Sequence, residues 1–355
     1  MNALWDPPPR RVAVFRALQL GDMLCAVPAL RALRAFLPEA RITLVGLPWA
    51  QSFVERFQRY VDDLLAFPGF PGCPEKEGTM GDFLGFLAAA RARRFDVAIQ
   101  LHGSGELSNR ITSLMAARRS AGFCPGEGAS GDPWLMPWPG TLPESERYLA
   151  LLEFLGVPAQ GRALELPLSW TDWEHWEGVA TRFGLRRRDF VCIHPGARLG
   201  SRRWPVERFA DVGRALARDG WRIVVTGSPD ERDLADAVLA RLPRGAIDLT
   251  GQTTLGSLAA LISKCALLVC NDTGVSHVAA AMGAASVVVA SGSDVERWAP
   301  LDRVRHRVLW HPVACRPCGH ESCPIGHPCA LGVAVESVVA AARAQLEARR
   351  RRHAP

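Results

Sequence analysis

Short β-branched runs alternate with amphipathic segments throughout this chain, and this rhythm limits its fold more than any other feature. In the second half the predicted strands are 190–194, 221–226, 246–249, 266–270, 286–290 and 304–310. The predicted helices between them include 206–218, 231–241 and 255–263. Strands that alternate with helices of about ten residues favour right-handed βαβ units and a parallel sheet covered on both faces.

The first half repeats the pattern. It predicts strands at 11–17, 41–45, 63–67 and 96–100 and helices at 23–36, 50–59 and 83–93. A Pro- and Gly-rich stretch, 124–143, is predicted to be an inserted loop. The fold class is therefore α/β, with two doubly wound Rossmann-like domains. We expect an N-terminal domain at 1–170, a linker at 171–188, a C-terminal domain at 189–335, and a C-terminal helix with a basic tail at 336–355.

Charge is unevenly divided between the halves. Residues 1–165 carry 17 Lys/Arg and 17 Asp/Glu, whereas 166–355 carry 25 and 19. The run Arg349 to Arg352 supplies part of this excess; it is either a solvated helix end or a contact for an anionic membrane face. Without interleaved aromatic residues or a reading motif, it does not indicate nucleic-acid binding.

The beginning of the chain and its apolar stretches bear on location. Residues 1–10 are polar and Pro-rich, which predicts no signal peptide and a cytoplasmic protein. The longest apolar stretches, 258–270 and 278–290, are too short to span a bilayer. Any membrane contact is therefore expected to be peripheral.

In doubly wound sheets ligands bind at the carboxyl ends of the strands, so the loops there are the candidate sites. Asp22 follows the first predicted strand and precedes an apolar helix. One interpretation is an N-cap, a position that Asp fills well. The other is a functional carboxylate at the edge of the sheet, favoured by anion-binding loops at the matching edge of the second half.

Three loops of the second half have the residues that phosphate binding requires. Gly196 and Ala197 would let backbone N–H groups approach a phosphate, and Arg202 can neutralise it. The free N–H groups of the helix that opens after residue 271 suit a diphosphate. Gly227 and Glu231 follow another strand, where such sheets often place a carboxylate against a ribose. The candidate residues around residue 271 are Asp272, Thr273, Gly274, Ser276 and His277.

The segment 102–108 looks like a dinucleotide fingerprint but lacks its third glycine and does not follow the first strand. It does not support NAD binding. We expect no cofactor.

These motifs resemble glycosyltransferase family 9, the ADP-heptose:lipopolysaccharide heptosyltransferases and their relatives. The resemblance covers about 11–339 and is most specific at Asp272-Thr273-Gly274 with Ser276-His277. It implies the GT-B fold, with two domains facing a cleft, and an inverting, metal-independent transfer of heptose from ADP-heptose to a lipid-linked anionic acceptor. It also implies that Asp22 is the general base and that Asp272, Thr273 and Gly274 bind the donor.

Two alternatives stay open from the residues. One is a family member with a different nucleotide-sugar donor or a non-lipopolysaccharide acceptor, since loop contacts set sugar preference and the family usually has Lys where Arg202 stands. The other is a nucleotide-sugar-binding protein without transfer activity. The presence of Asp22 at the expected position favours an enzyme.

Four cysteines lie close together near the C-terminal end: Cys315, Cys318, Cys323 and Cys329. Their spacing departs from the usual pair of CxxC knuckles, so the sequence leaves open structural zinc and reduced thiols.

Overall fold

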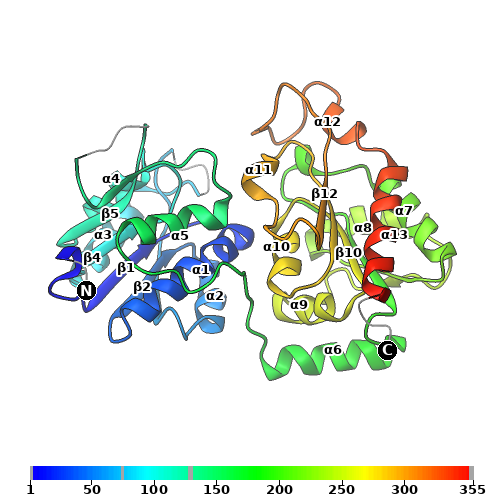
Figure 1. Ribbon diagram of the computed structural model, residues 1–355, viewed down its shortest axis with the longest axis horizontal. Coiled ribbons are helices and arrows are strands. Elements are labelled where there is room, and N and C mark those ends of the chain that lie inside the picture. The colour runs from blue at the N-terminus through cyan, green and yellow to red at the C-terminus, as the bar shows by residue number, and fades with distance from the viewer. Residues whose placement is uncertain (1–2, 73–75, 127–130, 352–355) are drawn as a thin grey trace. The chain divides into compact units, whose positions relative to one another are not determined.

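The computed structural model describes residues 3–72, 76–126 and 131–351. The chain divides into two compact units, the first ending at Ala163 and the second beginning at Leu164 (Figure 1). No helix in the described ranges is long and apolar enough to cross a membrane.

The first unit contains a six-stranded parallel sheet in the order β3-β2-β1-β4-β5-β6. Its strands are β1 (Arg11–Phe15), β2 (Arg41–Gly46), β3 (Asp63–Ala66), β4 (Val97–Gln100), β5 (Arg119–Cys124) and β6 (Leu135–Pro137). Its helices are η1 (Ala3–Trp5), α1 (Leu20–Phe36), η2 (Pro48–Ala50), α2 (Gln51–Arg56), α3 (Met80–Ala92), α4 (Ser108–Leu114) and α5 (Glu144–Phe154).

Alternating strand residues bury both faces of this sheet. On one face Phe15 and Phe67 pack against Phe83 of α3 and Ile111 of α4. Helices α1 and α5 pack against each other and cover the other face (Figure 1). A parallel sheet buried on both sides reads as continuous apolar runs, which is the pattern that made these strands predictable.

The second unit repeats the topology, with its parallel strands in the order β12-β11-β10-β7-β8-β9. They are β7 (Phe190–His194), β8 (Arg222–Val225), β9 (Ile247–Asp248), β10 (Leu267–Asn271), β11 (Ser286–Val289) and β12 (His306–Leu309). The helices are α6 (Trp170–Phe183), η3 (Gly200–Arg202), α7 (Val206–Arg218), η4 (Pro229–Glu231), α8 (Arg232–Leu239), α9 (Leu255–Lys264), α10 (Gly274–Ala281), α11 (Val295–Trp298), α12 (Pro328–Leu331) and α13 (Val335–Arg351).

The main core of this unit lies on one face of its sheet. Val191 and Val269 of the strands pack there with Phe209 of α7, Val238 of α8 and Val339 of α13. Helices α9 and α10 contact each other, and α10 also contacts β10 and β11. This arrangement confirms the predicted α/β class with two doubly wound parallel sheets.

Two segments differ from the sequence prediction. The stretch 124–143 is not only a loop, because β6 lies inside it and extends the first sheet beyond β5. Three residues, of which the last is a proline, are too few to show a strand period. The predicted linker 171–188 contains most of α6, which begins at a capping box of Ser169 and Asp172 and contacts α9.

Candidate functional site

Strand order reverses at the same position in both sheets, between β1 and β4 in the first and between β7 and β10 in the second. Loops that leave neighbouring strands there run in opposite directions and open a crevice, which is where such sheets bind ligands. The predicted catalytic residue follows β1, and most of the predicted donor-binding residues follow β7 and β10.

Asp22 lies in the first turn of α1, two residues after the helix begins at Leu20. The N-cap position belongs to Gln19, so the interpretation of Asp22 as the N-cap is wrong. Its side chain retains 23% of its exposure. A carboxylate in the first turn is favoured by the helix dipole and is accessible to solvent at this edge of the sheet.

Arg16 holds the turn that carries Asp22. Its side chain is fully buried, and its Nε and Nη2 donate to the Asp22 carbonyl oxygen at 2.8 and 2.6 Å. Nη1 donates to the carbonyl oxygen of Leu101, at the end of β4. One guanidinium therefore ties together the two strand ends at the switch point.

The charge of Arg16 is neutralised inside the protein. Its Nη2 lies 3.6 Å from Glu144 Oε1 and 4.0 Å from Asp22 Oδ1, and its guanidinium stacks 4.1 Å from the Tyr148 ring centroid. Glu144 also accepts from Arg147 at 3.2 Å and from the Tyr148 hydroxyl. Burial alone would lower the pKa of Arg16, but Tyr148, Glu144 and Asp22 raise it, so Arg16 stays charged.

In the second unit Asn271 holds the strand-end loop in place, as Arg16 does in the first unit. It is fully buried at the end of β10; its Oδ1 accepts from the Trp204 backbone N–H at 2.9 Å, and its Nδ2 donates to the Pro195 carbonyl oxygen at 2.7 Å. Asn271 thereby fixes both ends of the loop that follows β7, which contains Gly196, Ala197 and Arg202.

Glu231, Gly196 and Gly227 come together after β7 and β8. A Cβ at Gly196 would overlap the Glu231 carboxylate, which would have to shift, and a Cβ at Gly227 would lie 3.4 Å from Glu231 Cβ. Glu231 Oε2 accepts from the Ser228 N–H at 2.8 Å and lies 3.6 Å from His194 Nε2. Burial lowers the pKa of His194 despite Glu231, which favours the neutral imidazole.

Helix α10 begins at Gly274, after Thr273 in an extended N-cap conformation without a side-chain cap. Ser276 is buried and donates to the Thr273 carbonyl oxygen at 2.7 Å. His277 is buried, with its ring 6.3 Å from that of Trp298. Ser276 and His277 thus stabilise the first turn and its packing, whereas Asp272 and Thr273 are only half-buried.

The chain after β12 contacts these loops. Arg202 Nη2 donates to the Cys318 carbonyl oxygen at 2.9 Å, Ser201 N donates to the Glu321 carbonyl oxygen at 3.0 Å, and His327 Nε2 lies 2.9 Å from the Ser201 carbonyl oxygen.

Arg316 donates to the carbonyl oxygens of Ala290 at 3.0 Å and of Ser293. Burial, and then the charge of Arg202, lower the pKa of Arg316, while Asp272 raises it. Arg316 therefore lies near enough to Arg202 and to Asp272 to be influenced by both charges.

Several buried polar atoms in these strand-end loops have no hydrogen-bond partner among the described residues. They are Arg202 Nε, Thr250 Oγ1, Ser291 Oγ, Ser293 Oγ and Arg316 Nε. A buried polar atom without a partner costs about 1–3 kcal/mol, so a cluster of them needs an explanation. A ligand rich in acceptor oxygens would supply one.

The four clustered cysteines differ in exposure: Cys315 is exposed, Cys318 and Cys323 are half-buried, and Cys329 is buried. Within the described part of the chain no three His, Cys, Asp or Glu side chains are arranged to hold a metal ion. Cys318 N instead donates to the Gly292 carbonyl oxygen at 2.7 Å, so this segment covers the loop after β11.

Sequence reasoning missed Arg16, Glu144, Asn271 and Arg316 as organisers of the two sites. Asn271 and Arg316 stood inside segments already singled out, next to Asp272 and within the CxxC pair. For Arg16 the signal was a charged residue directly after an apolar strand. Glu144 gave none for this role, because Arg16, whose charge it neutralises, is 128 residues away in the sequence.

Comparisons with known proteins agree with this architecture. The model of a family described as glycosyltransferase family 9 (heptosyltransferase) matches residues 86–328. Lipopolysaccharide heptosyltransferase 2 is 26% identical in Escherichia coli strain K12 and 27% in Salmonella typhimurium, each over 82% of this chain and 85% of the relative.

Solved structures share the fold. A glycosyl transferase of family 9 from Veillonella parvula has a TM-score of 0.78 at 24% identity, over 95% of this chain and 97% of the other. The ADP-heptose lipopolysaccharide heptosyltransferase II of E. coli has a TM-score of 0.71 at 21% identity, over 96% and 99%. The two doubly wound units therefore form the GT-B fold.

Proposed function

Since the chain belongs to glycosyltransferase family 9, it is a glycosyltransferase, and we propose that it transfers a heptose from ADP-heptose to a lipopolysaccharide-core-type acceptor. Support for heptose as the transferred sugar and for the acceptor class comes from the names of the relatives, which are lipopolysaccharide heptosyltransferases. The lipid-linked acceptor would bring the enzyme to the cytoplasmic face of the inner membrane.

The observation that carries this proposal is the set of unpartnered donors in the second unit. Arg202 Nε, Arg316 Nε and the hydroxyls of Ser291 and Ser293 are buried without acceptors among the described residues. A diphosphate offers several acceptor oxygens and two negative charges. Charge-assisted hydrogen bonds from arginine to phosphate are the strong ones.

The other donor-binding residues have complementary roles. The uncapped N–H groups of α10 at Gly274 favour a negative group through the helix dipole. The backbone at Gly196 and Ala197 can approach the donor because neither position carries a bulky side chain. Glu231 and Asp272 would accept hydrogen bonds from ribose or sugar hydroxyls.

Asp22 would act as the general base. An acceptor hydroxyl is a poor nucleophile, so Asp22 removes the proton of that hydroxyl while the hydroxyl oxygen attacks the anomeric carbon of the donor sugar. The bond from that carbon to the diphosphate oxygen breaks in the same step, and one displacement inverts the configuration. The electron pair leaves on ADP, where Arg202 and Arg316 stabilise the developing charge in the role that a metal ion has in other transferases.

The test is a panel of nucleotide sugars assayed for binding and for transfer to lipopolysaccharide-core acceptors, with and without EDTA. We expect ADP-heptose to bind and react, and EDTA to leave turnover unchanged. Preference for a uridine or guanosine diphosphate sugar would contradict the donor. Turnover that vanished with EDTA and returned with Mg²⁺ would contradict metal independence.

A further inference from the structure

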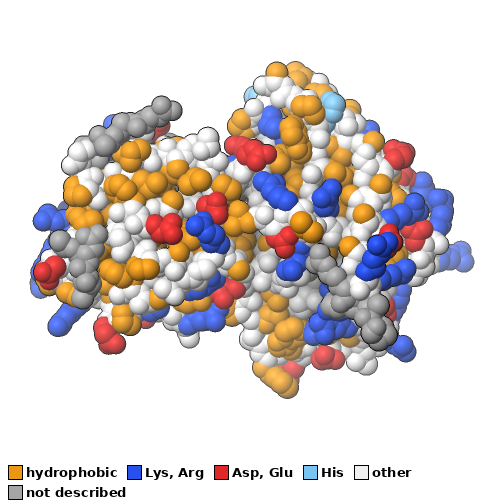
Figure 2. All heavy atoms as spheres, in the orientation of Figure 1, with side chains coloured by type: hydrophobic (Ala, Val, Ile, Leu, Met, Phe, Trp, Pro, Cys, Tyr) orange, Lys and Arg blue, Asp and Glu red, His pale blue; other side chains and the backbone are white. Residues whose placement is uncertain are grey.

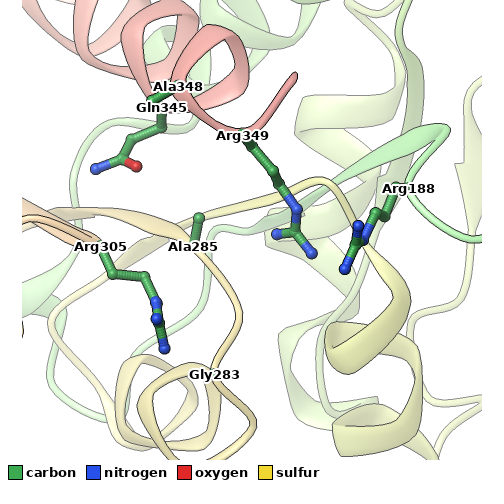
Figure 3. A pocket seen from close by; sticks show the side chains of 7 residues that line it. All are labelled: Arg188, Gly283, Ala285, Arg305, Gln345, Ala348 and Arg349. Carbon is green, nitrogen blue, oxygen red and sulfur yellow. The ribbon is translucent and has the colours of Figure 1, made fainter. Parts of the chain in front are cut away.

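Three arginines line a cavity in the second unit that the proposed transfer does not use. The cavity has a volume of about 280 Å³ and is lined by Arg188, Gly283, Ala285, Arg305, Gln345, Ala348 and Arg349 (Figure 3). Ala285 and Arg305 directly precede β11 and β12, and Arg188 lies two residues before β7. The cavity therefore lies at the amino ends of the strands, opposite the edge that carries the donor loops.

No acidic side chain is among the residues that line the cavity. The guanidinium groups of Arg188 and Arg349 point toward one another, while Arg305 lies across the cavity (Figure 3). Arg305 has an ion pair with Asp302, which is outside the lining, at 3.6 Å. Arg349 Nη1 donates to the Ala266 carbonyl oxygen at 2.9 Å. These contacts satisfy part of the hydrogen-bonding capacity of the arginines and leave the interior cationic.

Arg188 gives an independent indication of a missing acceptor. Its Nε is buried, with no hydrogen-bond partner in the part of the chain that the structure describes. Its backbone has a φ of 69°, in the left-handed region that non-glycine residues seldom adopt. Burial, followed by the charge of Arg187, lowers the pKa of Arg188. A negative group bound in the cavity would supply the missing acceptor and offset the repulsion from Arg187.

Arg349 also departs from the sequence prediction of a solvated helix end. It lies in α13 with its side chain half-buried in the cavity, while Arg352 falls outside the described residues. Burial, and then the charges of Arg188 and Arg305, lower the pKa of Arg349, although Cys265 opposes this. Figure 2 shows further Lys and Arg side chains gathered on the surface of the second unit.

We propose that this cavity binds a phosphate group through Arg188, Arg305 and Arg349. Its volume is near the lower end of ligand pockets, about 300 Å³, which suits a headgroup or a small phosphorylated molecule. Arginine matches phosphate oxygens with a planar fork of donors. The phosphate belongs either to a membrane lipid or to a free solute, and the inference does not rest on the proposed transfer.

The experiment titrates the full-length chain with pyrophosphate, with ADP present to fill the donor loops. Arg349→Gln and Arg305→Gln are compared with Arg351→Gln, a charge-matched control on α13 that is exposed and outside the cavity. We expect the two cavity variants to lose about tenfold or more in affinity, and Arg351→Gln to bind like wild type. If Arg349→Gln fails to fold, Arg305→Gln still tests the site.

A second arm sediments the same variants with phosphatidylglycerol vesicles and with phosphatidylcholine vesicles. Loss of phosphatidylglycerol binding in the cavity variants alone identifies a lipid headgroup as the source. Equal vesicle binding by all variants, together with weakened pyrophosphate binding in the cavity variants, identifies a free phosphate. If the cavity variants matched the control in both arms, the inference would be overturned.

Discussion

The two units have the same strand order, and in both the proposed functional residues lie where that order reverses, yet the charged groups there differ. In the first unit the buried Arg16 is neutralised by Glu144, and the group presented at the edge is the carboxylate of Asp22. In the second unit Arg202 and Arg316 keep donors without acceptors among the described residues. Under the proposed function, one architecture offers a base in the first unit and a phosphate site in the second, and the residues at the strand ends decide which.

The largest effect should come from replacing Arg16. Arg16→Met leaves Glu144 with one fewer compensating charge in the interior, and breaking a buried ion pair typically costs about 3–5 kcal/mol. We expect that loss in the free energy of unfolding, measured by urea denaturation, with the loss confined to the first unit.

The matched double variant Arg16→Met/Glu144→Gln separates charge from packing. If the ion pair dominates, the double variant recovers part of the lost free energy, because no unpaired buried carboxylate remains. A double variant less stable than Arg16→Met would contradict the account of Arg16 as a neutralised internal charge.

Arg202→Gln in the second unit should change ligand affinity rather than the free energy of unfolding. Removing one charge-assisted contact should weaken ADP binding by about 1.5–3 kcal/mol, read by calorimetry, while the free energy of unfolding changes little. Arg214→Gln on α7 is the control, because Arg214 has an exposed ion pair with Asp211. Equal ADP affinity in Arg202→Gln and wild type would remove Arg202 from the phosphate site.

Mild acid should lower the stability of the second unit, by a smaller amount than the loss expected for Arg16→Met. Burial, mainly, lowers the pKa of His306 to about 4, and its Nδ1 lies 2.8 Å from Ser286 Oγ. The unfolded chain takes up a proton near the ordinary value of 6.5, whereas the folded chain does so only near 4. Stability is therefore complete above pH 6.5 and is lost as the pH falls toward 4, by about 2.5 kcal/mol at pH 4.5.

Hydrogen exchange, corrected for intrinsic rates, measures this loss in each unit separately. Protection of β11 and β12 should fall between pH 7 and 4.5, and His306→Gln should reduce that fall. Equal pH dependence in His306→Gln and wild type would assign the acid sensitivity to other groups.

The strands and helices could be predicted from the sequence more fully than the side-chain contacts at the ends of the strands. Apolar strand runs and amphipathic helices such as α7 are local signals, and α7 was predicted with the bounds that the structure has. The contacts of Arg16 with Glu144 and of Arg202 with Cys318 join residues more than a hundred positions apart. Such pairs follow from tertiary packing, which one sequence does not encode in any local period. The strand β6 was missed for the opposite reason, because it is too short to have a period.

Asp22→Asn tests the central claim most directly, because the claim assigns chemistry to the first unit and phosphate binding to the second. Asparagine keeps the shape of the side chain but cannot take the proton of the acceptor. We predict that turnover with ADP-heptose and a competent acceptor falls by about 10²- to 10⁴-fold, while ADP affinity equals that of wild type. Wild-type turnover in Asp22→Asn would contradict the division of roles between the two units.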